Sequence, residues 1–340
     1  MNSYERVMSV VSGLKPDVTP VIPWVREWCS IQAGIDFIEE IESAEKHVDA
    51  QSFCVSRFGY DCVWDLLGMS AESEAMGSEL KIVKGHVPSI SKNIIHDYST
   101  DLSKLKFFDP YTNRRLATIL EGTRRLRQIY AGKVPIVAYV QAPLRHVSML
   151  RGTEKVMTDV FKQKDNLRKL CEIATDSLIV YAEAQIKAGA DIICLGDPVS
   201  SGAIISKKTW QEWGFPYTKR LVDTIKSKGV KAMLHVCGNT TDRLESLAAT
   251  GADILSLDMA VDFGKAREIL GPDVCLMGNV STTTLATGTP DEVRAETKAV
   301  IMRAGRNGRL IISAGCLIGE TCPAGNMEAM VSSAHEIRIA

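Results

Sequence analysis

The chain has 340 residues, enough for two ordinary domains or one large α/β barrel. Its 40 basic and 41 acidic residues give a formal net charge of -1, which offers no reason to expect nucleic acid or an anionic membrane as a partner. There is no apolar run of the roughly 18 residues that a membrane span needs and no signal-peptide layout, so we expect a cytoplasmic protein whose nine cysteines are reduced.

Eight short apolar runs are predicted to be β-strands. They are near-continuously apolar, as strands covered by helices are, and amphipathic stretches such as 167–189 and 218–229 lie between them. Gly189 and Gly251 precede two of the runs, where each is expected to end a helix. In chain order the runs lie at residues 20–24, 60–64, 134–140, 190–197, 230–238, 252–258, 274–280 and 309–316.

Eight strands alternating with helices favour a TIM (β/α)8 barrel over an open doubly wound sheet. The segments 25–59 and 65–133 are long enough for more than one helix each, so extra helices are expected near the N-terminus. No linker or low-complexity segment interrupts the chain, which predicts a single domain over residues 1–340.

Polar residues gather at the predicted strand ends, where a TIM barrel places its active site. Asp197, Asp258 and Asn279 are expected to orient a substrate or to hold other ligands in place. Two alternatives are structural, since Asp197 can cap the following helix and Asn279 can shape a turn. The remaining polar residues at strand ends are Trp64-Asp65, Gln141, His235, Cys237 and Cys316.

His235 and Cys237 lie two residues apart at the end of one strand, so their side chains point to the same face. Cys316 ends the last strand, and the three side chains are predicted to meet near the barrel axis. Three nitrogen and sulfur ligands with a fourth position open are typical of catalytic zinc. Cys322 is a rival ligand, but it lies beyond the strand end. The cysteines expected only to pack are Cys54, Cys62, Cys171, Cys194 and Cys275.

Several motifs are absent from the sequence. There is no GxGxxG, no GxxxxGK[ST] and no obvious nucleophile elbow, which argues against dinucleotide binding, a nucleotide P-loop and a serine hydrolase. The Asp-x-His-x-x-Gly sequence with which corrinoid-carrying domains ligate cobalt is also missing. Glu320 and Asp258 remain possible acids or bases without an assigned partner.

Four segments carry a family resemblance: "GADIICLGDP", "LHVCGN", "MGNVSTTTL" and "SAGCLIGETCPAGNMEAM". With them the region from about 178 to 331 resembles the uroporphyrinogen decarboxylase superfamily, and within it most closely the zinc-containing methylcobalamin:coenzyme M methyltransferases. The segments "SEAMGSEL" and "DPVSSGAIISKKTWQEW" extend the likeness, and Glu74 matches the family without a known role.

The resemblance implies that His235, Cys237 and Cys316 bind Zn²⁺ and activate a small thiol, most simply coenzyme M. Because the chain lacks a cobalt-ligating motif, the methyl group is expected to arrive as methylcobalamin on a separate corrinoid protein. The sulfonate of coenzyme M needs a cation, for which Arg145, beside His146, and Arg26 are the candidates. The alternative for Arg145 is a place on a solvated loop.

Three other functions remain open from the sequence. One is a metal-free decarboxylase acting on a porphyrin-like tetrapyrrole, although the N-terminal region keeps Arg26 and lacks the paired arginines of that enzyme. Another is a corrinoid methyltransferase with a different acceptor, such as a pterin amine. The third is a corrinoid-protein docking module whose zinc is structural, which would require four protein ligands.

Overall fold

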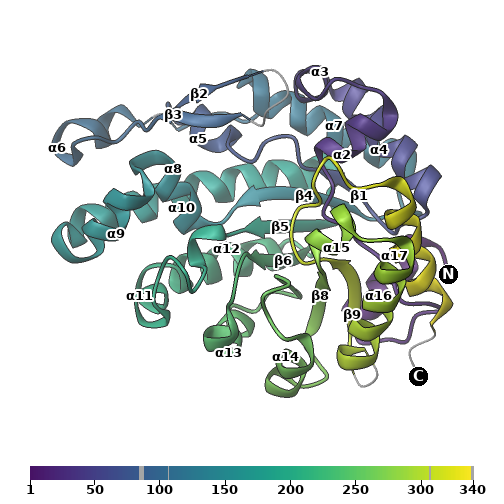
Figure 1. Cartoon of the computed structure of the whole chain (residues 1–340). Coiled ribbons are helices and arrows are strands. Elements are labelled where there is room, and N and C mark those ends of the chain that lie inside the picture. Colours follow the sequence, from purple (N-terminus) through teal and green to yellow (C-terminus); the bar gives the residue numbers. More distant parts are fainter. Residues whose placement is uncertain (84–87, 106, 306–307, 338–340) are drawn as a thin grey trace.

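The computed structural model describes residues 1–83, 88–105, 107–305 and 308–337. Seven parallel strands form one curled sheet whose spatial order follows the chain, with helices packed on its outer face (Figure 1). This arrangement confirms the predicted TIM barrel. The strands are β1 (Val63–Asp65), β4 (Ile136–Gln141), β5 (Ile192–Gly196), β6 (Lys231–Val236), β7 (Ile254–Leu257), β8 (Cys275–Val280) and β9 (Leu310–Ala314).

The first predicted strand, 20–24, forms only an isolated parallel bridge between Val21 and Ile312. On its other side the carbonyl of Val21 accepts a hydrogen bond of 2.7 Å from the amide of Asp61, so this segment lies between β9 and the start of β1. Pro20 and Pro23 flank the bridge, and a proline has no N–H to donate to a strand ladder. The prolines therefore explain why the prediction of a full strand was wrong here.

The N-terminal elaborations that the sequence predicts are present. Four helices precede β1, and helices together with an antiparallel hairpin occupy the stretch between β1 and β4, from which β2, β3 and α6 project (Figure 1). The sequence did not predict the hairpin. These elements are α1 (Ser3–Val11), α2 (Glu27–Ala33), α3 (Phe37–Glu42), α4 (Ala44–Phe58), α5 (Ala71–Ala75), β2 (Glu79–Lys81), β3 (Ser89–Lys92), α6 (Tyr98–Asp101), η1 (Leu102–Lys104) and α7 (Arg114–Tyr130).

The remaining helices connect successive strands. Gly189 ends α10 in the left-handed conformation, as predicted, and Thr289 and Glu292 cap the start of α16 reciprocally. These elements are α8 (Pro143–Arg151), α9 (Thr153–Lys162), α10 (Lys164–Ala188), η2 (Pro198–Ser200), α11 (Lys207–Trp213), α12 (Phe215–Ser227), η3 (Thr241–Arg243), α13 (Leu244–Ala248), α14 (Phe263–Leu270), α15 (Thr282–Thr287), α16 (Pro290–Ala304) and α17 (Ala324–Glu336).

The sheet is buried on both of its faces, so nearly every residue of its strands contributes to the core. This explains why the strands are continuously apolar in the sequence rather than alternating. Within the ranges that the structure describes, no helix is both long and apolar enough to cross a membrane.

Candidate metal centre

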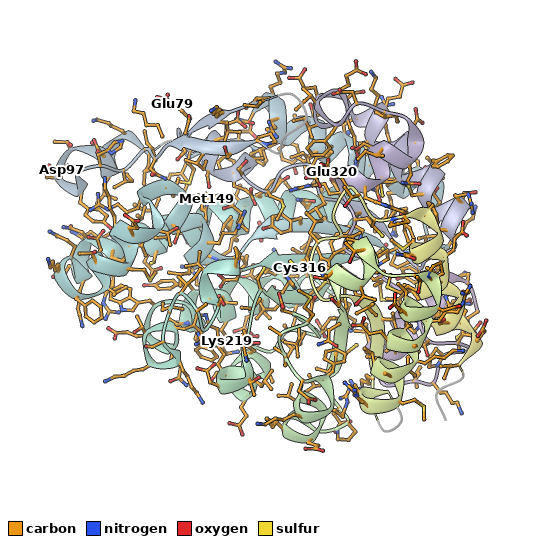
Figure 2. All side chains as sticks on the ribbon, viewed as in Figure 1. Glu79, Asp97, Met149, Lys219, Cys316 and Glu320 are labelled. Atoms are coloured by element: carbon orange, nitrogen blue, oxygen red, sulfur yellow. The ribbon has the colours of Figure 1, made fainter. Side chains whose placement is uncertain are left out.

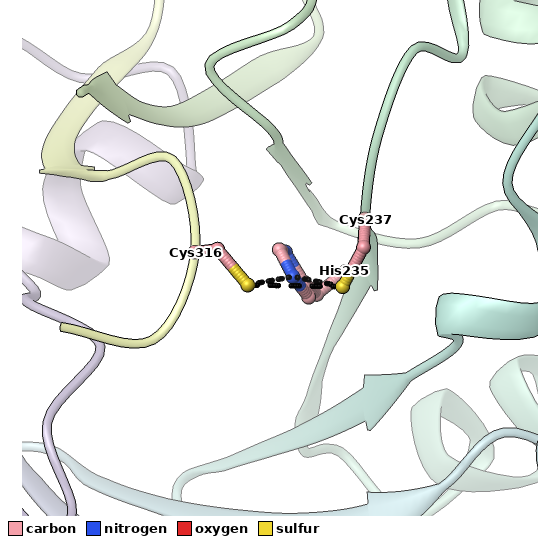
Figure 3. Close-up of side chains that lie close together, drawn as sticks. All are labelled: His235, Cys237 and Cys316. Carbon is pink, nitrogen blue, oxygen red and sulfur yellow. Dashed lines mark hydrogen bonds between the residues drawn. The ribbon is translucent and has the colours of Figure 1, made fainter. Parts of the chain in front are cut away.

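His235, Cys237 and Cys316 come together at the carboxyl end of the sheet. His235 Nε2 lies 3.4 Å from Cys237 Sγ and 3.7 Å from Cys316 Sγ, and the two sulfurs are 3.7 Å apart. Figure 3 shows the three side chains pointing toward one another, with Cys316 approaching from the loop after β9. In Figure 2 Cys316 lies over the middle of the molecule, whereas Glu79 and Asp97 lie on the projecting β2–β3 and α6 region.

Two glycines make this convergence possible. Gly238 follows Cys237 with a φ of +72°, and a Cβ there would lie 2.6 Å from the Ser201 hydroxyl. A Cβ on Gly315 would lie 2.3 Å from the backbone nitrogen of Met259. Since only glycine tolerates these positions without a shift, both loops can bring their cysteines inward.

The imidazole of His235 is held from behind by Ser256 and Trp24. His235 Nδ1 lies 3.0 Å from Ser256 Oγ, and Trp24 Nε1–H donates to the same oxygen at 3.0 Å. The Trp24 ring also packs against the imidazole at 4.6 Å between centroids. When Nδ1–H donates to Ser256, Nε2 keeps its lone pair and faces the sulfurs, which is the tautomer that a metal ligand needs.

The two cysteines titrate as a pair. The pKa of Cys316 is lowered, chiefly because its sulfur accepts a hydrogen bond from the Cys237 thiol, which outweighs the cost of burial. The pKa of Cys237 is raised well above the ordinary value because its thiol donates to Cys316 and is largely buried. The two sulfurs thus share a proton more readily than either loses it alone, and a cation that binds both as thiolates must displace it.

The donor set fits zinc. One imidazole nitrogen and two sulfurs, all within 4.8 Å of one another, form the only group of three or more potential metal-ligating side chains among the described residues. Soft sulfur donors with one imidazole favour zinc among the common cytosolic metals. The rival ligand Cys322 is outside the group, because it is buried elsewhere with its sulfur 3.6 Å from the carbonyl of Pro323.

Ser256→Ala is expected to weaken zinc binding about ten- to a hundredfold, because it removes the acceptor that fixes the His235 ring and leaves two buried N–H groups without a partner. Chelator competition measures the zinc affinity. Ser313→Ala is the matched control, since Ser313 is equally buried on β9 and its hydroxyl has no partner among the described residues. Equal affinities for the two variants would contradict this role of Ser256.

A cavity of about 310 Å³ adjoins the three candidate ligands. Its walls are mostly apolar, with few polar side chains among them. Tyr139, Arg145 and Arg26 are three of these polar side chains, and the Arg26 guanidinium is already paired with Glu27. The lining residues besides the three ligands are Trp24, Arg26, Met69, Ser70, Pro88, Tyr139, Arg145, Met149, Gly196, Pro198 and Leu317.

Of the four predicted substrate-binding residues, Arg145 lines this cavity and Asp197, Asp258 and Asn279 do not. Arg145 lines it, which places the guanidinium at the cavity rather than on a solvated loop. Asp197 is buried, and its carboxylate accepts hydrogen bonds from the Ser200 amide and hydroxyl, so it caps η2 as the structural alternative proposed. Its neighbours Gly196 and Pro198 line the cavity, whereas Asp197 itself does not.

Asp258 and Asn279 are joined through the loop after β7. The Asn279 amide donates to the backbone carbonyls of Asp258 and Val261, at 3.1 and 2.8 Å, and so holds that loop. Asp258 is partly buried and accepts a hydrogen bond from the amide of Ala260. Neither residue lines the cavity, and a substrate-binding role for them remains a prediction.

His146 and Glu74 do not line the cavity. The His146 ring is enclosed between Ser73 and Met76, and burial together with the nearby Arg145 lowers its pKa to about 3, so it stays neutral. The Glu74 carboxylate lies 3.5 Å from the Arg115 guanidinium.

The sequence did not reveal Trp24, Ser256 and Tyr139 as parts of the site. Each lies on a predicted strand, and an aromatic or small residue is ordinary at a buried strand position.

The match to known proteins extends beyond the segments that carry the resemblance. A family model described as uroporphyrinogen decarboxylase (URO-D) matches residues 2–337. The chain belongs to the uroporphyrinogen decarboxylase family. This confirms the resemblance read from the sequence and covers nearly the whole chain.

Relatives within the uroporphyrinogen decarboxylase family differ in the activity that their names state. A methylcobamide:CoM methyltransferase, MtbA, of Methanosarcina mazei is 29% identical over 323 residues, covering 91% of this chain and 92% of the relative. A uroporphyrinogen decarboxylase of Myxococcus xanthus is 27% identical over 322 residues, covering 90% and 89%. A solved structure, a methyltransferase from Methanosarcina mazei, superposes with a TM-score of 0.90 at 25% identity over 99% of both chains. Family membership alone therefore does not distinguish methyl transfer from decarboxylation, and the distinction has to rest on the residues of the site.

Proposed function

We propose that this chain is a zinc-dependent methyltransferase that moves a methyl group from a methylated corrinoid to a small thiol, with coenzyme M as the preferred acceptor. The observation that carries the proposal is the cluster of His235, Cys237 and Cys316 beside a small apolar-walled cavity. The relative named as a methylcobamide:CoM methyltransferase supports the same reaction.

His235, Cys237 and Cys316 would hold the zinc, which lowers the pKa of a bound thiol so that the sulfur is a nucleophile at neutral pH. Trp24 and Ser256 keep His235 Nε2 aimed at the two cysteine sulfurs, and the apolar walls of the cavity would keep water from the bound thiol. Arg145 orients the far end of the acceptor. In this reaction the thiol proton would pass to solvent, the sulfur would form the S–C bond with the methyl group, and the electron pair of the broken Co–C bond would remain on cobalt.

The metal-free decarboxylase is the second candidate, because a relative with that name has nearly the same identity. A tetrapyrrole with several carboxylates needs several cations around it. Among the described residues that line the cavity, the cationic side chains are Arg26 and Arg145, and Arg26 is paired with Glu27. This charge arrangement favours an acceptor with one anionic group.

A panel of small thiols with free methylcobalamin as donor tests the proposal. Protein loaded with zinc is expected to convert 2-mercaptoethanesulfonate to its methyl thioether, measured by mass spectrometry and by the loss of methylcobalamin absorbance. Failure to methylate any thiol, with decarboxylation of uroporphyrinogen by metal-free protein, would establish the second candidate instead.

The purified chain is expected to carry no corrinoid, because it lacks the Asp-x-His-x-x-Gly sequence that ligates cobalt. Protein from cobalamin-fed cells should show no visible corrinoid absorption, and a separate methylated corrinoid protein should be a faster donor than free methylcobalamin. Corrinoid that stays bound through gel filtration of the isolated chain would contradict this expectation.

A further inference from the structure

Tyr139, on β4, has a buried hydroxyl group that no residue of the described chain engages. Its side chain lines the cavity, the residue is only 3% exposed, and the hydroxyl has no hydrogen-bond partner within the described ranges. The ring lies directly over Gly196, where an added Cβ would be 2.6 Å from the tyrosine oxygen. Position 196 therefore has to be glycine for the ring to lie where it does.

Arg145, whose side chain lines the same cavity, also has an unpaired donor. The guanidinium of Arg145 donates one hydrogen bond, from Nη2 to the backbone carbonyl of Met69 at 3.3 Å. Its Nε is buried without an acceptor, and Arg145 forms no ion pair with any carboxylate among the described residues. A buried donor left without an acceptor costs stability, and the side chains of Tyr139 and Arg145 both contribute to the wall of one small cavity, so their unpaired donors point to a ligand in that cavity.

The two donors are suited to an oxyanion. Burial raises the pKa of Tyr139, so its hydroxyl stays protonated and can donate, and the neighbouring Arg145 carries a permanent positive charge. The side chains of Met69, Met149 and Leu317 supply part of the apolar wall of the cavity. Such a cavity accepts a short aliphatic chain with the sulfur at one end and an anionic head group at the other.

Resting on the proposed function, we propose that the Tyr139 hydroxyl is a specificity-determining group that donates a hydrogen bond to the sulfonate or carboxylate of the thiol acceptor, beside Arg145. The acceptors of this enzyme are then short thiols that carry an oxyanion, and uncharged thiols are poor substrates. Tyr139 selects the acceptor and takes no part in moving the methyl group.

The test is Tyr139→Phe, which removes only the hydroxyl. The kcat/KM for 2-mercaptoethanesulfonate and for 3-mercaptopropionate, measured with free methylcobalamin, is expected to fall at least about tenfold, as the loss of a hydrogen bond to a charged group predicts. The kcat/KM for ethanethiol is expected to change less than about twofold. Zinc content should stay the same, and the melting temperature should be unchanged or higher, because an unpaired buried hydroxyl is lost.

Tyr181→Phe is the matched control. Tyr181 lies on α10, is 1% exposed and also has a buried hydroxyl without a partner among the described residues, but it does not line the cavity. This variant is expected to leave all three kcat/KM values unchanged. An equal loss for all three thiols in Tyr139→Phe, or no loss for any of them, would overturn the proposal.

A binding measurement separates this inference from the proposed function. Ethanesulfonate has the oxyanion and no thiol, so its binding, followed by calorimetric competition, depends on Tyr139 and Arg145 and does not require methyl transfer. Weaker binding to Tyr139→Phe supports the oxyanion site even if the wild-type chain methylates no thiol. Equal binding to both proteins overturns the oxyanion site even if thiols are methylated.

Discussion

Cys316→Ala is expected to prevent zinc binding and to slow methyl transfer strongly. Cys316 supplies one of the three atoms of the proposed metal site, and its sulfur lies 3.7 Å from both Cys237 Sγ and His235 Nε2. A metal ion that activates its substrate contributes several kcal/mol to catalysis, so we expect kcat/KM to fall by on the order of 10³-fold. Zinc per chain, measured by mass spectrometry on protein without a histidine tag, should fall from near one to well below it.

Cys322→Ala is the control for this prediction. Cys322 lies six residues further along the same segment but outside the ligand cluster, with its sulfur near the carbonyl of Pro323. Its zinc content and activity should match those of the wild type. Zinc that persists in Cys316→Ala and disappears in Cys322→Ala would show that the ligand assignment is wrong.

The sequence predicted most of the barrel because its strands are buried on both sides. Continuous apolar runs mark β4 to β9, and the polar residues that follow them mark the carboxyl edge of the sheet. A full first strand was predicted at 20–24 because these residues are apolar, but the two prolines around Val21 limit the pairing to one bridge. The β2–β3 hairpin was missed because its residues are largely exposed and do not form an apolar run.

The candidate metal-binding cluster was predictable because histidine and cysteine at a strand end are unusual next to an apolar run. The residues that hold His235 in place were not predictable. Ser256 and Trp24 are ordinary residues for an interior position, and only the three-dimensional contact at 3.0 Å shows that both meet behind His235. Tyr139 is likewise one more aromatic residue in an apolar run until its unpaired hydroxyl is seen. A sequence shows which residues can react, but not which buried polar atoms lack a partner.

Arg145→Ala is expected to raise KM for 2-mercaptoethanesulfonate while the zinc stays bound. Arg145 lines the cavity, and its guanidinium has no carboxylate partner among the described residues. Removing one charged hydrogen-bonding partner costs about 1.5–3 kcal/mol, which corresponds to about a ten- to hundredfold loss in kcat/KM. Steady-state kinetics with the sulfonate thiol and with 2-mercaptoethanol measures the difference, and the uncharged thiol should be nearly indifferent to the change.

Arg145→Lys distinguishes charge from geometry in the same measurement. Lysine keeps the positive charge but cannot present two parallel N–H groups to an oxyanion, so it should recover only part of the loss. Zinc content near one per chain in both variants shows that the effect lies in acceptor binding, because Arg145 is not among the three ligands. An equal loss of kcat/KM for the sulfonate thiol and 2-mercaptoethanol in Arg145→Ala would instead show that Arg145 maintains the cavity as a whole, and the anionic end of the acceptor would then have to bind elsewhere.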